Sequence, residues 1–422
     1  MNSRFCERSV VWSQGDDRDT ERPIHGIAVP AHKRDATHSY KYYFATGAIL
    51  EESNDCLKQQ KCTMIGRYGK SDDARGLAQV FTTLVPFGLL WWAAIRLISV
   101  SPWLAVVPLP FIILLTVRAF GLMHECGHGS LFRSRWLNRL VGFLLGVMSG
   151  MPQYVWSQHH NYHHAHNGNW DKYRGPYTTL SVDEYAALSQ ARQGLYRFKC
   201  SVAAAPLAGF IYLIFNPRFT WTKGSIGLVI HALRQKVAQP GISLQAHAAT
   251  YKTRYWKSAR EYRHMLWNNL ALLGVWVSMC AACGTADFFF IYVITVSIAG
   301  GAGIVLFTVQ HNFEHSYASD GEHWDQDTGA MEGTSLLLLP RWLNWFTVDI
   351  GYHHIHHLSA SIPNYRLAKC HDEYQHLFAD VTRVRLREVP AALKCILWDR
   401  SARRIISVAE YQRRSWRDLA AL

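Results

Sequence analysis

Four apolar segments, each about as long as the ~20 residues needed to cross a bilayer, constrain what this chain can fold into. They are residues 79–100, 103–123, 266–283 and 288–309. Only Ser101 and Pro102 separate the first two, and four residues separate the last two. Because such short connections join antiparallel neighbours, the sequence predicts two membrane-spanning hairpins. Two shorter apolar stretches, residues 141–151 and 202–215, contain Gly or Pro and favour interfacial or re-entrant helices.

Composition agrees with a membrane protein. Of the 422 residues, 49% are hydrophobic and 18% are charged, below the ~25% charged content of an average soluble domain. The formal net charge is +13, but no basic helix or recognition module organises it, so we expect no nucleic-acid partner.

Three regions are expected along the chain. Residues 1–78 form a polar arm with few periodic apolar positions, which predicts disorder, and Met64 within it is an alternative start of translation. Residues 79–378 contain the spans and the histidine clusters. Residues 379–422 form a basic cytoplasmic tail.

The histidine clusters all fall on one side of the membrane. One follows the second span, one precedes the third and others follow the fourth, so even numbers of crossings separate them. The segment between spans two and three is rich in Lys and Arg, which places this side and both chain ends in the cytoplasm. We expect a multi-pass protein of a bacterial inner membrane.

These clusters have the spacing of metal ligands. Histidines three or four positions apart share one face of a helix, so we expect each cluster to point its imidazoles at a common centre. One catalytic zinc takes three protein ligands and a water, which would leave most of these histidines unused. Two metals can use eight or nine imidazoles, and imidazole also suits iron. The clustered histidines are His124 and His128; His160, His163 and His164; and His353, His356 and His357.

The stretch HECGH, residues 124–128, also matches the H-E-x-x-H signature of zinc proteases. That interpretation needs Glu125 as a general base and a single zinc. It gives the other clusters no role, and we keep it as the less favoured alternative.

From about Gly66 to about Phe378 the chain resembles the membrane fatty acid desaturases, in particular the bacterial acyl-lipid type. The resemblance rests on four motifs that occur in the family's order: HECGHGSLFRS, WSQHHNYHHAHNGN, VQHNFEH and WFTVDIGYHHIHHLSASIPNYRLAKCHDE. It implies an enzyme with two iron ions, Fe2+ or Fe3+, that uses O2 and two electrons to introduce a cis double bond into a lipid-linked acyl chain.

The resemblance also implies the ligands. It carries the iron-binding role onto the eight clustered histidines and onto His311, which matches an additional family histidine. Four histidines fall outside the pattern: His159, His166, His315 and His354.

Two acidic residues accompany the predicted ligands. Glu125, where relatives commonly have Asp, is expected to hydrogen-bond a ligand imidazole and fix its tautomer. Asp349 stands where Asn is expected. It either contacts an iron-bound water or caps the following helix.

We therefore expect an all-α integral membrane protein. Four transmembrane helices form two hairpins, and a cytoplasmic helical cap, made of residues 155–263 and the C-terminal segment, holds the di-iron site. The substrate is an acyl-lipid or an acyl thioester in contact with membrane lipid. A di-iron hydroxylase or ketolase of another lipid, such as a carotenoid, is the alternative that shares every histidine.

The electrons must come from a partner protein. The chain has no cysteine set spaced for an iron-sulfur cluster and no recognisable cytochrome b5 segment. The GGAG sequence at residues 300–303 lies inside an apolar span, where it indicates close helix packing rather than a nucleotide site. We expect a ferredoxin or a cytochrome b5-type electron donor, steered by basic residues of the cytoplasmic side.

Overall fold

A computed structural model describes residues 57–175 and 178–420. The chain divides into two compact units after Gly66. The described part of the first unit, residues 57–66, is helical, and the disorder predicted for residues 1–56 lies outside the described residues. The following paragraphs concern the second unit.

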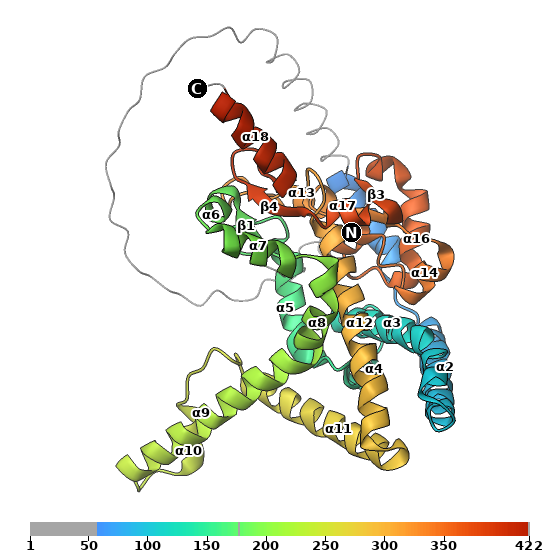
Figure 1. Ribbon diagram of the computed structural model, residues 1–422, viewed down its shortest axis with the longest axis vertical. Helices are drawn as coiled ribbons and strands as arrows, with labels where there is room; N and C mark the ends of the chain where they lie inside the picture. Colours follow the sequence, from blue (N-terminus) through green and yellow to red (C-terminus); the bar gives the residue numbers. More distant parts are fainter. Residues whose placement is uncertain (1–56, 176–177, 421–422) are drawn as a thin grey trace, which may run out of the picture. The chain divides into compact units, whose positions relative to one another are not determined.

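Four long helices form the two expected hairpins. Helices α2 (Asp73–Ile98) and α3 (Leu109–His128) are joined through the short helix η1 (Pro102–Val106). Helices α11 (Ala259–Cys283) and α12 (Thr285–His311) meet at Gly284, whose φ of 86° is readily adopted by glycine. Each helix extends several residues beyond the apolar segment that predicted it, because the polar residues at its ends continue the helix. Helix α3 packs against both α2 and α12 (Figure 1).

A fifth long helical segment is longer than the sequence analysis predicted: the predicted apolar stretch ended at residue 215, but the helix continues to Ala238. Residues 202–238 pass through η2 (Val202–Ala204), α8 (Ala205–Phe210), the π-helical turn η3 (Ile211–Phe215) and α9 (Asn216–Ala238). Pro217 does not end this run, because it stands in the first turn of α9, directly after the π-helical turn, where its missing N–H costs little. By length and composition, five helices are therefore candidates to cross a membrane among the described residues.

The remaining helices are shorter, and most of them lie in the polar half of the unit (Figure 1). They are α4 (Arg135–Ser149), α5 (Gln153–His166), α6 (Val182–Ala186), α7 (Gln190–Lys199), α10 (Leu244–Ala249), α13 (Gln326–Met331), α14 (Arg341–Phe346), α15 (His353–Leu358), α16 (Asn364–Glu373), η4 (Gln375–Phe378), η5 (Leu386–Glu388), α17 (Val389–Ala392) and α18 (Val408–Ala420). Helix α4 instead packs against α3, and α10 follows α9 (Figure 1).

Two small sheets correct the expectation of a purely α-helical protein, although the chain is mostly helical. Strand β4 (Cys395–Asp399) pairs in parallel with β1 (Leu180–Ser181) and antiparallel with β5 (Arg404–Ser407). Strand β2 (Leu336–Leu338) pairs in parallel with β3 (Arg383–Arg385). These strands are too short to produce a recognisable alternating pattern, which is why the sequence did not reveal them.

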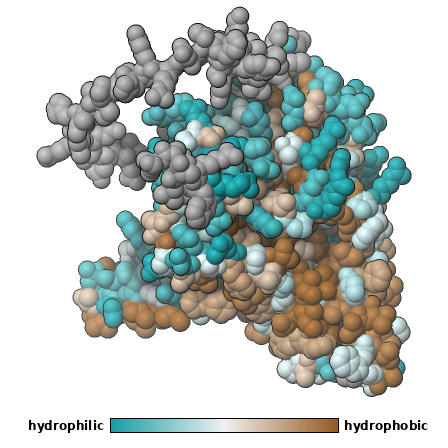
Figure 2. All heavy atoms as spheres, turned by 45° about the horizontal axis from the view of Figure 1, so that its top comes forward, coloured by the Kyte–Doolittle hydropathy of each residue, from teal (hydrophilic) through white to brown (hydrophobic). Residues whose placement is uncertain are grey.

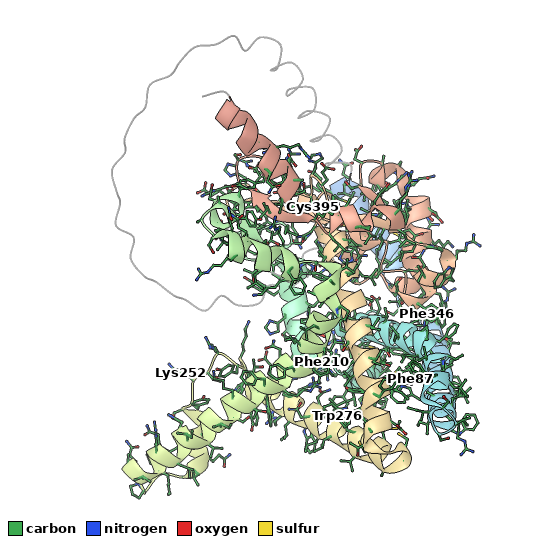
Figure 3. The ribbon with its side chains drawn as sticks, in the orientation of Figure 1. Phe87, Phe210, Lys252, Trp276, Phe346 and Cys395 are labelled. Carbon is green, nitrogen blue, oxygen red and sulfur yellow. The ribbon has the colours of Figure 1, made fainter. Side chains whose placement is uncertain are left out.

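Apolar and polar residues separate clearly within the unit. Figure 2 shows hydrophobic side chains gathered over one part of the surface and hydrophilic side chains over the other. Phe87 on α2 and Trp276 on α11 lie in the helical hairpins, whereas Cys395 lies in the small sheet (Figure 3). The largest apolar core centres on α3, where Ile112 and Leu122 are fully buried. This separation is that of a membrane protein with one polar region.

Helices α8 and α12 approach each other closely because glycines face each other. A Cβ atom at Gly209 would overlap the backbone of Gly300 and Gly301, and one at Gly301 would lie 2.9 Å from the backbone of Ala205. Absence of side chains at such a contact allows helix backbones to pack directly, as in small-residue membrane interfaces. The packing role predicted for the GGAG sequence is confirmed for its first two residues.

Replacing Gly209 tests this contact. We expect Gly209→Ala to destabilise the protein by about 1–3 kcal/mol through overpacking, seen as a lower thermal unfolding midpoint in detergent. Gly274→Ala is the matched control: Gly274 is exposed on α11 with nothing within 4 Å of a Cβ, so alanine there leaves stability unchanged or raises it by up to about 1 kcal/mol. Equal midpoints for the two variants would contradict the contact.

Candidate metal centre

Nine histidines from four helices converge in two groups. All ligand atoms within a group lie within 4.8 Å of one another. The larger group contains His124, His128, His160, His164 and His356, and the smaller contains His163, His311, His353 and His357. These are the nine predicted ligands, and the structure brings all of them together.

The sequence analysis expected each cluster to point its imidazoles at one centre, and this expectation was wrong for the clusters of α5 and α15. Helix α5 gives His160 and His164 to the larger group and His163 to the smaller, and α15 divides its histidines in the same way. Positions i and i+4 share a helix face, whereas position i+3 is turned by ~100° from i+4. One helix therefore serves two adjacent groups. The rings of His164 and His357, one from each group, stack with centroids 4.1 Å apart.

The groups lie where four helices end. His128 is the last residue of α3, and His311 is the last residue of α12. Helices α5 and α15 likewise carry ligand histidines in their last turns. The C-terminal end of a helix carries the negative end of its dipole, so four such ends favour bound cations.

The nitrogen atoms are spaced as if around a metal. His124 Nε2 lies 2.9 Å from His160 Nε2, and His163 Nε2 lies 3.1 Å from His311 Nε2. Two ligand atoms ~2.1 Å from one ion at a right angle would be about 3.0 Å apart. Three further buried nitrogens, His128 Nε2, His356 Nε2 and His357 Nε2, have no hydrogen-bond partner. The residues present therefore fit a metal in each group.

The environment keeps these imidazoles neutral. Burial lowers the pKa of six of these histidines well below the ordinary value, and the neighbouring imidazoles lower it further. A neutral imidazole has a free lone pair, which is the state that binds a metal. The six are His160, His163, His164, His353, His356 and His357.

Glu125 makes the expected contact with an imidazole of the larger group. Its Oε1 lies 3.1 Å from His124 Nδ1, and its Oε2 accepts hydrogen bonds from Ser130 Oγ (2.9 Å) and from the backbone N–H of Asn364 (3.0 Å). The carboxylate only accepts, so Nδ1 carries the proton and Nε2 faces the metal group with its lone pair. The side chain is fully buried. It is therefore held as a hydrogen-bond partner and not aimed at an open position of the site as a general base.

A hydrogen-bonded chain continues from Glu125 to the membrane helices. Asn364 Nδ2 donates to Gln79 Oε1 (2.8 Å), and Arg118 Nη2 donates to the same oxygen (3.4 Å). Arg118 also donates from Nε to Thr83 Oγ1 (3.0 Å). Sequence reasoning placed Arg118 in a span but assigned it no role, although a charged residue inside a membrane helix is a strong signal of a buried partner.

Asp349 is close to the site but outside both groups. It does not cap α15, because the N-cap residue is Tyr352 and no side chain bonds to the helix start. Burial raises the pKa of Asp349 to about 6, while Arg118 opposes the shift. The four histidines left out of the predicted set also stay outside the two groups. Of these, His354 is buried and pairs with His371 Nδ1 at 3.1 Å, whereas His159 and His315 are exposed.

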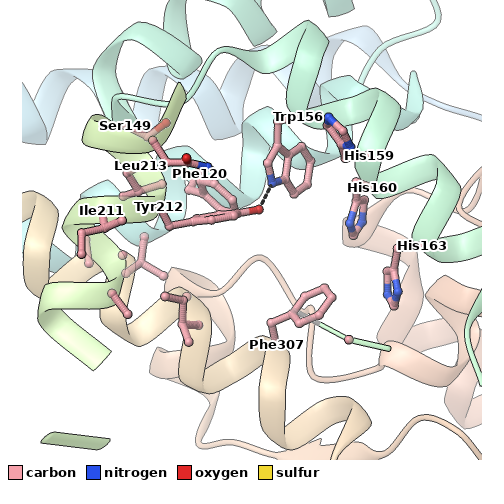
Figure 4. A pocket seen from close by; sticks show the side chains of 18 of the residues that line it. Phe120, Ser149, Trp156, His159, His160, His163, Ile211, Tyr212, Leu213 and Phe307 are labelled. Atoms are coloured by element: carbon pink, nitrogen blue, oxygen red, sulfur yellow. Dashed lines mark hydrogen bonds between the residues drawn. The ribbon is translucent and has the colours of Figure 1, made fainter. Parts of the chain in front are cut away.

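A cavity of about 570 Å³ reaches both metal groups, since His160 and His163 line it. Its other walls are mainly apolar and come mostly from α3, α5, η3 and α12. Figure 4 shows the two histidines across the cavity from Ile211 and Leu213. Trp156 Nε1 donates to the Tyr212 hydroxyl at 2.9 Å and joins α5 to η3 at its edge (Figure 4).

A second cavity of about 70 Å³ shares His160 with the larger one. It is lined by His124, His160 and His353, and its far wall includes Thr347 and Ile350. Of the aromatic residues near the motifs, Trp156 and Tyr162 line the larger cavity. Two all-imidazole groups that could each hold a metal, beside a mainly apolar cavity, are the features of a membrane metalloprotein with a site for an apolar ligand.

Comparison with known proteins gives the family. The model of the fatty acid desaturase family matches residues 101–388. A fatty acid desaturase of Bacillus subtilis (strain 168) is 30% identical over 85% of this chain and 93% of its own length. An sn-1 oleoyl-lipid 12-desaturase of Anabaena variabilis is 23% identical over 75% of this chain and 81% of its own, and an omega-3 fatty acid desaturase of the endoplasmic reticulum of Nicotiana tabacum is 26% identical over 59% of each chain.

The chain belongs to the fatty acid desaturase family, as its histidine motifs predicted, and it is an oxidoreductase. These relatives favour neither the hydroxylase or ketolase nor the zinc protease.

Glu125→Gln tests the orienting contact. The Gln amide oxygen can keep both hydrogen bonds from Ser130 and Asn364, and its NH2 then faces His124 Nδ1. The proton of His124 must move to Nε2, which blocks metal binding. Loss of such a partner typically weakens metal affinity by about 10–100-fold. We expect lower metal content by elemental mass spectrometry, with unchanged content in a variant of the exposed Glu322, Glu322→Gln. Full metal loading of Glu125→Gln would contradict the assigned role.

Proposed function

We propose that this desaturase introduces a cis double bond into a lipid-linked acyl chain at two iron ions held by the two histidine groups. The observation that carries the proposal is the position of the groups. Nine imidazoles from four helix ends meet directly beside an apolar cavity of about 570 Å³. This volume is within the ~300–1,000 Å³ of typical ligand sites.

The donor set supports iron over a single zinc. A catalytic zinc would use about three of the ligands and leave the second group without a role. Glu125, the base of a zinc protease, already has three hydrogen-bond partners. Iron suits imidazole and, with O2 and two electrons, supplies the oxidising power needed to attack an unactivated methylene pair.

The reaction balances with an external donor. Two adjacent CH2 groups lose two hydrogen atoms, that is two protons and two electrons, as the double bond forms. One O2 takes up these two electrons, two electrons from the donor and the corresponding protons, and leaves as two waters. No acid or base of the chain is needed to break the C–H bonds, since they are not acidic. The chain's own task is to hold the methylene pair beside the metals and to exclude water.

The cavity residues perform that task. Val117, Phe120 and Phe307 offer apolar contacts on the side that faces His160 and His163. The Trp156–Tyr212 hydrogen bond satisfies the two polar atoms at the edge of an otherwise apolar wall. An acyl tail therefore meets a mainly apolar surface, and the shape of the cavity determines which carbon pair lies next to the metals.

We further propose four membrane spans, α2, α3, α11 and α12, with the metal centre and both chain ends on the cytoplasmic side of a bacterial inner membrane. The ligand histidines of α3 and α12 stand at the same polar end of the two hairpins. Charges of the segment between α3 and α11 are mainly Lys and Arg, for instance Lys252, Arg254 and Lys257, which favours the cytoplasm. Lys252 lies on the loop that follows α10 (Figure 3).

The fifth candidate helix fits the membrane surface better than a span. Five exposed apolar residues of α9 recur at intervals of three, four or seven and so form one stripe: Phe219, Ile226, Ile230, Leu233 and Val237. The opposite face is covered, because a Cβ at Gly224 or Gly227 would overlap Trp256 or Tyr251. One apolar stripe along a basic helix is typical of a helix that lies in the interface. Figure 1 shows α9 and α10 extending away from α12.

Depth measurements along α9 test this arrangement. Nitroxide amino acids encoded at positions 219, 226, 233 and 237 avoid labelling the nine native cysteines. In a bilayer, an interfacial helix gives four similar, shallow depths by paramagnetic relaxation. In a spanning helix, positions 219 and 237 would lie about 27 Å apart along the helix axis. A steady change in depth along the series would refute the interfacial position.

We propose that electrons come from an acidic ferredoxin or cytochrome b5-type partner at the exposed arginines of β3. Arg383 and Arg385 point outward from β3, which pairs with β2. Leu336 of β2 forms a bridge with Tyr352, the residue before the ligand His353. This short connection from the basic surface to the metal group supports β3 as the docking site of the donor. Complementary charge between the arginines and an acidic donor would speed their association.

The relatives guide the choice of substrate. Four proteins similar to this chain are named sn-1 oleoyl-lipid 12-desaturases. We therefore propose a glycerolipid-bound acyl chain, rather than an acyl thioester, and a double bond twelve carbons from the carboxyl end.

The fatty acid profile of cells that express the protein tests the reaction. Gas chromatography with mass spectrometry of derivatised lipids should reveal a new double bond with the native chain. His163→Ala should abolish it, because this residue lies in the smaller metal group and also lines the cavity. His166→Ala, outside both groups, is the control and should retain the product. An unchanged profile with the native chain, or product formation by His163→Ala, would contradict the proposal.

A further inference from the structure

Gly303 is the residue of the GGAG sequence that helix packing does not explain. Gly300 and Gly301 lie against the backbone of α8, but a Cβ at Gly303 would have nothing within 4 Å. Glycine destabilises a helix interior relative to alanine, so its presence there usually has a packing or functional reason. Since no atom needs the space, the reason lies in the space itself.

That space is the junction of the two cavities beside the metal groups. The larger cavity and the cavity of about 70 Å³ share one set of wall residues. The shared residues are Val117, Phe120, Trp156, His160, Gly303 and Phe307. Gly303 alone among them has no side chain.

Gly303 is also well placed along α12. It lies one turn before Phe307, whose ring centroid is 4.9 Å from those of His163 and His311. A side chain at position 303 would project into the junction next to Phe307. The smaller cavity, bounded by His124 and His353, would then be separated from the larger one.

We propose that Gly303 is a specificity-determining residue: its missing side chain keeps the two cavities continuous and sets how far an acyl chain extends past the metal centre. The inference rests on the proposed desaturation, because it concerns the chain that occupies the cavity. The smaller cavity accepts the part of the acyl chain beyond the reacting carbons. Filling the junction therefore excludes long chains more strongly than short ones.

A series of substitutions at position 303 tests this role. Cells expressing the native chain, Gly303→Ala or Gly303→Leu are supplied with saturated acyl chains of graded length, and the products are measured by mass spectrometry. One methylene changes discrimination by about 10–200-fold in a fitted pocket, so Gly303→Leu should lower the ratio of long-chain to short-chain product at least about tenfold. Gly303→Ala should shift it in the same direction by less.

Gly274→Leu is the matched control, since Gly274 is an exposed glycine of α11 that also has nothing within 4 Å of a Cβ. It should keep the native ratio. If the Gly303→Leu protein does not accumulate in a metal-bound form, the ratio of long-chain to short-chain product made by Gly303→Ala is the test. A native ratio in the Gly303 variants that accumulate overturns the inference. Absence of any double bond with the native chain overturns the proposed function instead.

Discussion

The structure depends on bringing nine imidazoles together at one buried place. Their nitrogens lie as close as 2.9 Å, and several have no hydrogen-bond partner. Unsatisfied buried nitrogens are costly, and cations bound between them remove that cost. The ends of α3, α5, α12 and α15 add the negative ends of four helix dipoles. Metal binding in the two groups would therefore be coupled to folding.

The rest of the unit holds these helix ends in place. Glycines at positions 209, 300 and 301 bring α8 against α12, so that η3 forms a wall of the cavity below the metal groups. From the other side, the chain of hydrogen bonds through Gln79, Asn364 and Glu125 ties α2 and α16 to His124. Membrane helices thus fix the ligands, and the polar cap closes over them.

Apolar length and helical spacing, which are local properties, predicted the two helical hairpins, and with the family resemblance they predicted the nine histidines that the structure groups and the contact between Glu125 and His124. The division of each cluster between two groups was missed, since it depends on how α5 and α15 are rotated against their neighbours. The continuation of the helix from residue 202 to Ala238 was missed because the apolar pattern ends at Phe215 and the Gly and Pro within residues 202–215 were read as interruptions. The pairing of β1 with β4 joins residues more than 200 positions apart, which no local pattern reveals.

The most direct test of the central claim is to locate and identify the metals in the purified protein by anomalous X-ray scattering at the iron and zinc edges. We predict two iron peaks, one among His124, His128, His160, His164 and His356 and the other among His163, His311, His353 and His357. A single zinc peak at His124 and His128, with the second group empty, would contradict the account.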